Sequence, residues 1–534
     1  SLALDVNADP LRPIYHIASP ANWMNDPHGA IFYDGFYHLF YQTNPYGNNW
    51  GFISWGHVVS QDGVYWEHRP LALVPVPDGY DEHGVFSGCC VMFPQDGSNP
   101  ATCQPTIFYT GLRRSETPHR DVNLSEQSQL MATVDVSIAG SSDFPADRLA
   151  SLDRWQKRTQ PIITAQSHPH FQAGIDQSTD NLDCMRDPFV WQEADGNWYM
   201  LLGTALRRSK NSQHVEGNAL LYQYQDDGWH CLGQFAQTSH GRNWECCNYL
   251  RLGQKTDEME ILIISPEYRK HDLGNPRAKE KKFVLWAAGS TKHALTQTPQ
   301  PQEKGYFLPQ PDAQMGERWH VLDHGGYDGF YAATTLQHEG KTILWGWSTG
   351  GGQPHTNWNG VLTLPRQLEW RDPALRMLPM PWIEDLRGAL LYQNCNFILG
   401  GDQQEAHHLA AGDCVEIKAE IGLGDGDGVV FSMWGDVVKV GLHCQQRTMT
   451  IHDANHCYEA PLNRHIDLKH FVFRCFLDRS ILEVFLDDVQ VITRRVYPRD
   501  IHQQNIAVYA ANSGDWVNVM GLKVWRMNSI WKNR

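Results

Sequence analysis

Short apolar runs bounded by Gly, Pro, Asn or Asp follow one another along the first two-thirds of the chain. Examples are "FYHLFYQ", "TIFYTG", "NWYMLLG", "EILIISP", "FVLWAAG" and "TILWGWS". Few stretches between these runs show sustained helical periodicity. The pattern predicts an all-β fold, and a sandwich, a barrel and a propeller all fit it. Because no sharp repeat period accompanies the runs, the pattern does not choose among the three architectures.

The last third of the chain alternates apolar and polar residues more cleanly. The segment "RDPALRMLPMPWIEDLRGALL" is rich in Pro and predicts a linker over residues 371–399. Beyond it, runs such as "CVEIKAEI", "VVKVGLH" and "VNVMGLKVW" are typical of a β-sandwich with polar outer faces. A chain of 534 residues is long enough for two domains. We therefore expect one β domain over residues 1–370 and a β-sandwich over residues 400–534.

The overall charge argues against nucleic acid as a partner. Lys and Arg number 44 against 60 Asp and Glu, so the formal net charge is -16 and a phosphate backbone would be repelled. The sequence has no run of about 18 apolar residues, so we expect no membrane span. A neutral ligand fits this charge better. The 20 Trp suit stacking on sugar rings and packing in a core alike.

The 12 cysteines do not follow the spacing of a metal site or a small disulfide scaffold. Two pairs are vicinal, Cys89-Cys90 and Cys246-Cys247, and no CxxC occurs. We therefore expect no metal and no cofactor. The segment "SLALDVNADP" lacks a charged start followed by a long apolar stretch, so we expect no signal peptide in this chain. The compartment stays open, with a secreted or periplasmic location favoured over a cytoplasmic one.

Three carboxylates have a context that suits catalysis. Asp26 lies in "WMNDPHG", Asp187 in "MRDPFVW" and Glu245 in "NWECCNYL", each beside aromatic residues at the edge of a strand-like run. Taken singly, each is more often structural, as a turn aspartate, an ion-pair partner or a strand-end glutamate. Together they suit glycoside cleavage, which needs a carboxylic acid and a second carboxylate that attacks or activates water. A third polar group can hold the sugar hydroxyls.

An ordered set of motifs identifies a family. The segments "NWMNDPHG", "FYHLFYQTNP", "NNWGFISWGHVVSQD", "FSG", "RDP" and "WEC" occur in the order seen in glycoside hydrolase family 32. The likeness continues through "DHGGYDGFYAATT" and "WNGVLTLPRQL" to "DRSILEVFLDDVQVITRRVYP", so it covers nearly the whole chain. The chain resembles the β-fructofuranosidases of that family, which include invertases, exo-inulinases, levanases and fructosyltransferases.

The resemblance implies a five-bladed β-propeller followed by a C-terminal β-sandwich. It also implies a retaining, two-step hydrolysis of terminal β-D-fructofuranosyl bonds in sucrose, fructo-oligosaccharides or fructans. Asp26 matches the nucleophile, Glu245 the general acid/base and Asp187 the transition-state stabiliser. For retention, the carboxyl groups of Asp26 and Glu245 should lie roughly 5–5.5 Å apart.

Two other functions use the same sequence features. A fructosyltransferase would share the covalent intermediate and pass it to a sugar acceptor in place of water. A non-catalytic fructan-binding protein would be expected to lack a catalytic carboxylate, and all three are present. The "WMNDP" and "WEC" context argues against an arabinan-cleaving enzyme of the same fold.

The resemblance also implies a substrate-binding set of hydroxyl ligands and pocket walls, namely Asn25, Gln42, Trp50, Phe86, Ser87, Arg186 and Trp347. Arg186 either bonds sugar hydroxyls, orients a carboxylate, or forms an ion pair without touching the ligand. Trp345 competes with Trp347, because strand alternation places both on one face.

The chain departs from the family pattern at two positions near the site. His28 stands where the family usually has Asn, and we expect it at the periphery of the pocket. Asn248 stands where the family often has an acid, in "ECCN" instead of "ECPD". The C-terminal sandwich either covers the side of the first domain or supplies a surface for a homo-oligomer.

Overall fold

The computed structural model describes an almost purely β-structure. The described residues are 8–96, 99–114, 125–134, 151–164, 182–207, 215–238, 240–253, 258–268, 283–291, 295, 305–311, 318–326, 329–349, 356–371, 374–400, 406–424, 428–498 and 500–531. Within them, the named helices are two short 3-10 helices, η1 (Pro100–Thr102) and η5 (Pro381–Leu386). The predicted all-β class is confirmed. In the described part, no helix is long and apolar enough to cross a membrane.

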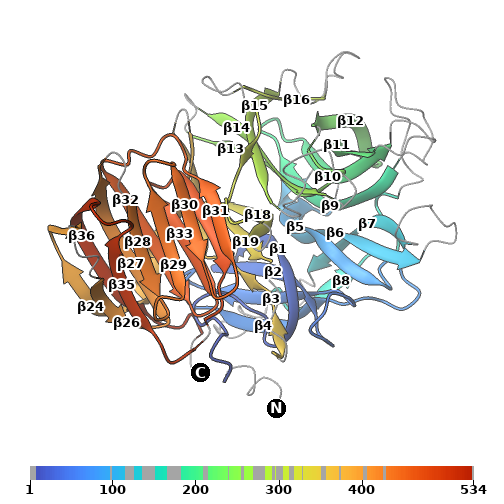
Figure 1. Cartoon of the computed structure of the whole chain (residues 1–534). Coiled ribbons are helices and arrows are strands. Elements are labelled where there is room, and N and C mark those ends of the chain that lie inside the picture. Colours follow the sequence, from blue (N-terminus) through green and yellow to red (C-terminus); the bar gives the residue numbers. More distant parts are fainter. Residues whose placement is uncertain are drawn as a thin grey trace.

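Five largely antiparallel sheets contain strands β1 to β23 (Figure 1). The first has the order β20 (Trp358–Asn359), β1 (Asn22–Tyr33), β2 (Phe36–Asn44), β3 (Ser54–Ser60), β4 (Glu67–Leu73). The second comprises β5 (Gly84–Pro94), β6 (Cys103–Arg114), β7 (Ser125–Val134) and β8 (Trp155–Lys157). The third comprises β9 (Leu182–Gln192), β10 (Trp198–Arg207), β11 (Val215–Gln225) and β12 (Gly228–Gln237).

The fourth and fifth sheets complete this part of the molecule. The fourth comprises β13 (Asn243–Leu252), β14 (Met259–Glu267), β15 (Leu285–Thr291), β16 (Phe307–Pro309) and β17 (His320–Val321). The fifth comprises β18 (Phe330–His338), β19 (Lys341–Ser348), β21 (Val361–Leu362), β22 (Arg366–Arg371) and β23 (Ala374–Pro379).

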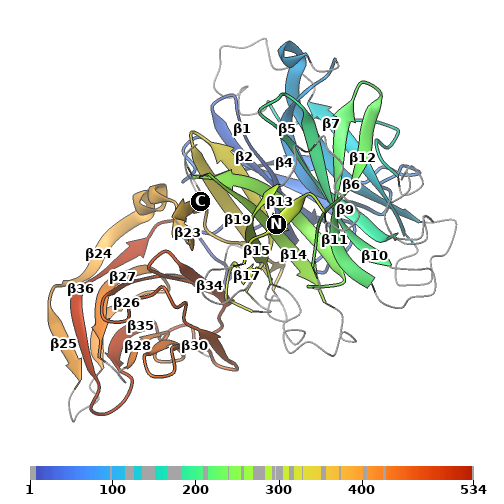
Figure 2. The same cartoon turned by 90° about the horizontal axis from the view of Figure 1, so that it is seen from above.

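One strand of each sheet faces a shared central cavity. These inner strands are β1, β5, β9, β13 and β18; each contacts the next, and β18 contacts β1. They line a cavity of about 680 Å³. Outer strands such as β7, β10 and β12 lie towards the edge of the molecule in Figure 2. The cavity is therefore enclosed by segments that lie far apart in the sequence.

The remaining strands form two further sheets beside the first five (Figures 1 and 2). One contains β24 (Arg387–Asn394), β25 (Phe397–Gly400), β36 (Trp516–Met527), β27 (Cys414–Leu423), β32 (Phe471–Asp478), β33 (Ile481–Leu486) and β34 (Gln490–Arg495). The other contains β26 (His407–Ala411), β35 (Asn505–Ala510), β28 (Gly428–Met433), β29 (Val438–His443), β30 (Thr448–His452) and β31 (Cys457–Pro461).

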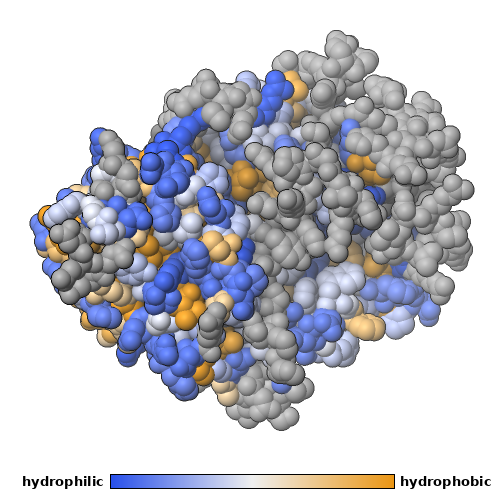
Figure 3. Space-filling model, in the orientation of Figure 1, coloured by the Kyte–Doolittle hydropathy of each residue, from blue (hydrophilic) through white to orange (hydrophobic). Residues whose placement is uncertain are grey.

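The two C-terminal sheets pack face to face. Phe431 of one sheet stacks on Phe473 of the other with ring centroids 4.1 Å apart, within a core of buried aliphatic side chains. On the face seen in Figure 3, these sheets carry mostly hydrophilic side chains, with hydrophobic ones in small groups. Apolar residues inside and polar residues outside follow from the period-2 alternation of the sequence.

The segment expected to be a linker, residues 371–399, contains regular structure. Strand β23 completes the fifth sheet, whereas β24 and β25 pair with β36 of a C-terminal sheet. The chain passes between the two parts through residues 380–386, which contain η5. The prolines of "LPMPW" lack the N–H that would extend β23. Much of β24 is exposed, so its apolar residues do not alternate with polar ones in the way that predicts a strand.

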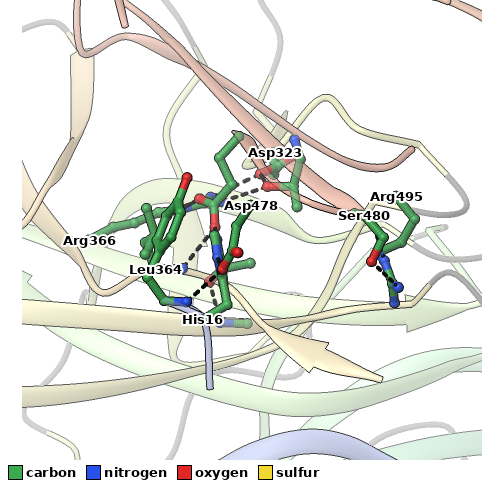
Figure 4. Close-up of polar contacts among 12 residues, drawn as sticks. His16, Asp323, Leu364, Arg366, Asp478, Ser480 and Arg495 are labelled. Atoms are coloured by element: carbon green, nitrogen blue, oxygen red, sulfur yellow. Dashed lines mark hydrogen bonds and ion pairs between the residues drawn. The ribbon is translucent and has the colours of Figure 1, made fainter. Parts of the chain in front are cut away.

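A buried polar network joins the C-terminal sheets to the first part (Figure 4). Arg366 of β22 donates to Asp323 at 2.9 Å and to Glu483 of β33 at 2.6 Å, and all three side chains are inaccessible to solvent. His16 bonds Asp478 at 2.8 Å and Glu483 at 3.1 Å. Burial lowers the pKa of His16, but its bonds to the two carboxylates outweigh this effect and raise it. Two basic groups, Arg366 and His16, are therefore bonded to the three buried carboxylates of this network.

We predict that Arg366→Met lowers the free energy of unfolding by about 3–5 kcal/mol, because it leaves Asp323 and Glu483 buried without their cation. Urea unfolding followed by tryptophan fluorescence would measure the change. Arg371→Met is the matched control, since Arg371 pairs with Glu369 while 60% exposed and should cost under about 1 kcal/mol. Equal effects of the two variants would contradict this account of the interface.

Candidate active site

All five inner strands interrupt their regular pairing close to their first residues. The register shifts with respect to the neighbouring strand between Met24 and Pro27, Val85 and Gly88, Arg186 and Phe189, Glu245 and Asn248, and Tyr331 and Thr334. A bulge of this kind re-aims side chains, and bulges are frequent beside active sites. Asp26, Asp187 and Glu245 lie at three of the five bulges. The structure thus brings the three predicted carboxylates to one end of the cavity.

Asp26 is held by a chain of side-chain hydrogen bonds. Ser87 of β5 donates to Asp26 Oδ2 at 2.8 Å, and Asn25 donates to Asp26 Oδ1 at 3.2 Å. Asn25 also donates to Gln42 Oε1 at 2.6 Å, and Gln42 in turn donates to Ser87. Three of the predicted substrate-binding residues, Asn25, Gln42 and Ser87, therefore form a hydrogen-bonded chain with both ends on the predicted nucleophile. Their mutual bonds fix its orientation.

Asp187 occupies a strained backbone position. Its φ is 62°, in the left-handed region that side chains other than Gly, Asn and Asp rarely adopt. Its N–H donates to Thr110 Oγ1 at 3.0 Å, and its Oδ2 accepts the N–H of Cys246 at 3.1 Å. Asp187 is 5% exposed. Strain of this kind persists only where the surroundings impose it, and it is frequent at functional sites.

Glu245 accepts hydrogen bonds from two other strands. Arg186 of β9 donates through Nε at 3.1 Å and Nη2 at 2.7 Å to Glu245 Oε1. The hydroxyl of Tyr331, on β18, donates to Oε2 at 2.5 Å. Arg186 thus orients a carboxylate, which was one of its three expected roles. A Cβ on Gly203 would lie 2.1 Å from the Trp244 carbonyl, so only glycine lets β10 pass beside Glu245.

Cys246 lies between two of the carboxylates. Its Sγ is 3.7 Å from Asp26 Oδ2 and 3.7 Å from Asp187 Oδ2. Burial raises the pKa of this thiol well above its usual value, and Asp187 and Asp26 raise it further. The group therefore stays a neutral S–H that can donate to either carboxylate. Cys246 and Tyr331 were not singled out from the sequence, although both lie in quoted motifs, "WEC" and "GFYAATT".

Burial, together with the charges of this cluster, raises the pKa of Asp187 to about 7. Burial is the largest cause; Arg186 opposes it, and the charges of Glu245 and Asp26 add to it. Because the three carboxylates interact, they titrate as a group. A proton is therefore available within the cluster near neutral pH.

Aromatic side chains form the surroundings of the cluster. Trp50 meets Phe86 edge to face with ring centroids 5.9 Å apart, and Phe86 directly precedes Ser87. Trp347 meets Trp23 in the same way at 5.8 Å, and Trp23 donates to Asn25 at 2.7 Å. Trp345 is also buried, but of the two tryptophans only Trp347 has a ring contact with Trp23. Its position makes Trp347 the better candidate for a pocket wall.

The peripheral position expected for His28 is wrong. Its side chain is only 2% exposed and lines the central cavity. The ring stacks on Trp55 with centroids 3.8 Å apart. Burial lowers the pKa of His28 well below its usual value, so the imidazole is neutral. His28 lies between two register shifts of β1, one between Met24 and Pro27 and one between His28 and Ile31, and the sequence does not reveal which face the residue takes.

Asn248 has a structural role that explains the missing acid. Its amide donates to the carbonyls of Cys246 and Ala333, both at 2.9 Å, and its oxygen accepts from Thr335 at 2.8 Å. Asn248 thereby links β13 to β18. A carboxylate could not make the two donated bonds.

The described residues contain no group of three or more His, Cys, Asp or Glu side chains placed to hold a metal ion. The site brings together carboxylates, a guanidinium, a phenol and a thiol. Paired carboxylates beside hydroxyl-binding amides can cleave a glycosidic bond.

Comparison with known proteins agrees with this chemistry. Residues 16–380 match the glycosyl hydrolases family 32 N-terminal domain, and residues 431–526 match the glycosyl hydrolases family 32 C-terminal domain. The chain belongs to glycoside hydrolase family 32. All three carboxylates lie in the N-terminal match, and membership of the family makes the protein a glycosidase.

Relatives in family 32 cover nearly the whole chain. A raffinose invertase of Escherichia coli is 29% identical over 522 residues, covering 94% of this chain and 92% of the relative. A levanase of Bacillus subtilis is 27% identical over 569 residues, covering 97% of this chain and 71% of the relative. An exo-inulinase structure from Aspergillus awamori has a TM-score of 0.75 at 20% identity, covering 98% of this chain and 99% of that one. The last likeness concerns the fold alone.

We predict that Asp187→Asn stabilises the protein at pH 8 while abolishing turnover. The pKa of Asp187 is about 7 in the folded protein against 3.8 for a free side chain, so the folded state holds a proton that the unfolded chain gives up. Wild-type stability should fall as the pH rises from about 4 through about 7, by a few kcal/mol at most. The variant, which keeps an acceptor for the Cys246 N–H, should lack this fall.

Thermal unfolding of both proteins between pH 4 and pH 8 would test this prediction. Asp34→Asn, in the β1–β2 turn, is the control, and it should follow the wild type at every pH. A stability difference between wild type and Asp187→Asn that stays constant across this range would show that Asp187 does not exchange a proton there.

Proposed function

We propose that this family 32 glycosidase hydrolyses terminal β-D-fructofuranosyl bonds with retention of configuration. The observation that carries the proposal is the convergence of the three carboxylates around Cys246. The Sγ of Cys246 is 3.7 Å from an oxygen of Asp26 and 3.7 Å from an oxygen of Asp187, and the adjacent Glu245 bonds Arg186. The relatives named raffinose invertase and levanase support a fructosyl substrate. So does the structural neighbour from Bombyx mori named a β-fructofuranosidase in complex with sucrose.

The proposed first step forms a bond between enzyme and sugar. An oxygen of Asp26 attacks the anomeric carbon of the fructosyl unit as the glycosidic C–O bond breaks. The proton that the cluster holds on Asp187 moves to Glu245 when the substrate binds and passes from there to the departing oxygen, so the leaving sugar departs as an alcohol. In the second step Glu245 takes a proton from water, the water oxygen attacks the same carbon, and the Asp26 carboxylate is released.

The neighbouring residues support these steps. Arg186 and Tyr331 hold both oxygens of Glu245, which keeps the carboxyl aimed at the glycosidic oxygen. Ser87 and Asn25 hold Asp26 in the orientation for attack. Asp187 is placed to accept hydrogen bonds from hydroxyls of the fructosyl unit. Such hydrogen bonds strengthen as the sugar ring becomes cationic.

We further infer that the five sheets around the cavity are the blades of a five-bladed β-propeller. The two C-terminal sheets would be the β-sandwich. On this view the catalytic domain ends near Pro379 and the sandwich begins near Arg387, where the strands change sheet. The match of the family's N-terminal domain to residues 16–380 supports that boundary.

We predict that Asp26→Asn and Glu245→Gln each lower kcat on sucrose by at least ~10³-fold while leaving the fold intact. Asp34→Asn is the matched control from the same hairpin as Asp26. Initial rates, with circular dichroism as the check on folding, would measure the effect. Folded variants with near-normal turnover would exclude these residues as the catalytic pair.

Product analysis tests the reaction itself. On sucrose, 1-kestose, inulin and levan, we expect free fructose that NMR first detects as the β-anomer, because two displacements restore the configuration. First appearance of the α-anomer would exclude a retaining mechanism. Longer oligosaccharides in place of fructose would identify a transferase.

A further inference from the structure

The loop between β2 and β3, residues 45–53, exposes aromatic rings that the proposed mechanism does not use. Tyr46 is 82% exposed and Phe52 is 69% exposed, the highest values for large hydrophobic side chains in the described part of the chain. Their rings meet edge to face with centroids 6.3 Å apart. Trp50, in the same loop, is 56% exposed. Exposed apolar groups that gather in this way mark binding surfaces more often than chance.

The backbone of this loop is fixed. Trp23 N–H donates to the Gly47 carbonyl at 3.1 Å, and the Asn22 amide donates to the Pro45 carbonyl at 2.8 Å. At the far end of the loop, Val85 N–H donates to the Ile53 carbonyl at 2.8 Å. The backbone that carries the rings is therefore held before any ligand arrives, which reduces the entropy lost on binding.

Phe52 has an unfavourable backbone conformation. Its φ is 47°, a region in which a bulky side chain is an outlier. An aromatic residue at such a position is both strained and exposed to water, so it gains little stability from its own contacts. Strain held by a rigid surrounding structure points to a function for the side chain.

The loop is continuous with the catalytic pocket. Trp50 contacts Phe86, whose neighbour Ser87 donates to Asp26. The bonds to Asn22 and Trp23 tie the loop to the start of β1, a few residues before Asp26. Trp50, which contacts the pocket through Phe86, is 56% exposed, and Tyr46 and Phe52 of the same loop are more exposed still.

We propose that Tyr46 and Phe52 form a subsite for a sugar ring of an oligosaccharide, beyond the unit that directly leaves the cleaved bond. Aromatic faces pack against the apolar C–H faces of sugar rings. The loop "PYGNNWGFI" contains no charged side chain, which favours a neutral sugar over a phosphorylated one. This inference rests on the proposed fructosidase function. It adds that chains longer than a disaccharide gain a contact that sucrose does not make.

The test compares kcat/KM on sucrose with that on 1-kestose and inulin for Tyr46→Ala and Phe52→Asn. Asn removes the ring at position 52 but tolerates the left-handed backbone. We expect kcat/KM on the two longer substrates to fall about threefold to tenfold, mainly through KM. The value on sucrose should stay within about twofold. Trp516→Ala is the control, because Trp516 is a 59% exposed aromatic residue of the C-terminal sheets.

The outcomes separate the two hypotheses. Equal falls on all substrates, or no fall on any, would overturn the subsite while leaving the fructosidase function in place. A wild-type protein that leaves sucrose, 1-kestose and inulin intact would contradict both. Light scattering on the same variants tests a second copy of the chain as the occupant. If a variant loses a dimer that the wild type forms, while its kcat/KM on 1-kestose and inulin relative to sucrose is unchanged, the loop is a contact between copies of the chain and not a sugar subsite.

Discussion

The bulges of the five inner strands are the constraint on which the site depends. A regular strand sends successive side chains to opposite faces, so it cannot aim several neighbouring groups at one point. At each bulge this alternation breaks, and a polar side chain of β1, β5, β9 or β13 can turn towards the cavity. Left-handed φ angles at Asp187, Cys246 and Ala332 are the local cost. Regular pairing along the rest of each strand keeps these residues in place.

The electrostatics of the site follow from the same crowding. Three carboxylates converge in the site, and Arg186 bonds one of them, Glu245. Because the carboxylates repel one another, one carboxyl group is driven towards its neutral form near pH 7. Burial makes Asp187 that group. Cys246 relieves part of the repulsion, because a neutral S–H placed between two carboxylates can donate a hydrogen bond without adding charge. An alanine there would remove the one side-chain donor that reaches both Asp26 and Asp187, and an aspartate would add a fourth negative charge.

The sequence predicted the strands and the three carboxylates, because both leave local signals. Alternation and turn residues mark strands, and "NDP", "RDP" and "WEC" mark the bulges that carry the carboxylates. The fivefold recurrence of the bulges could not be predicted, since the residues that form them differ at every site. His28 and Tyr331 were misplaced or missed for a related reason. Tyr331 bonds Glu245 of another sheet, and His28 stacks on Trp55 of β3, so both environments are made by residues distant in sequence. The strands within residues 371–399 were not predicted, because the sequence of η5 and of the exposed strand β24 lacks a regular pattern.

The C-terminal sheets support the site although no catalytic candidate lies in them. Asp323, a few residues before β18, bonds Arg366 of β22 and the backbone and hydroxyl of Thr493 on β34. The start of β18, which carries Tyr331, is therefore anchored through β34, and Tyr331 holds one oxygen of Glu245. If the chain ended after β23, Asp323 and Arg366 would lose Glu483 and Thr493 and would face water. The strand that orients Glu245 would then lose its fixed end, so the position of the candidate acid depends on the fold of both parts.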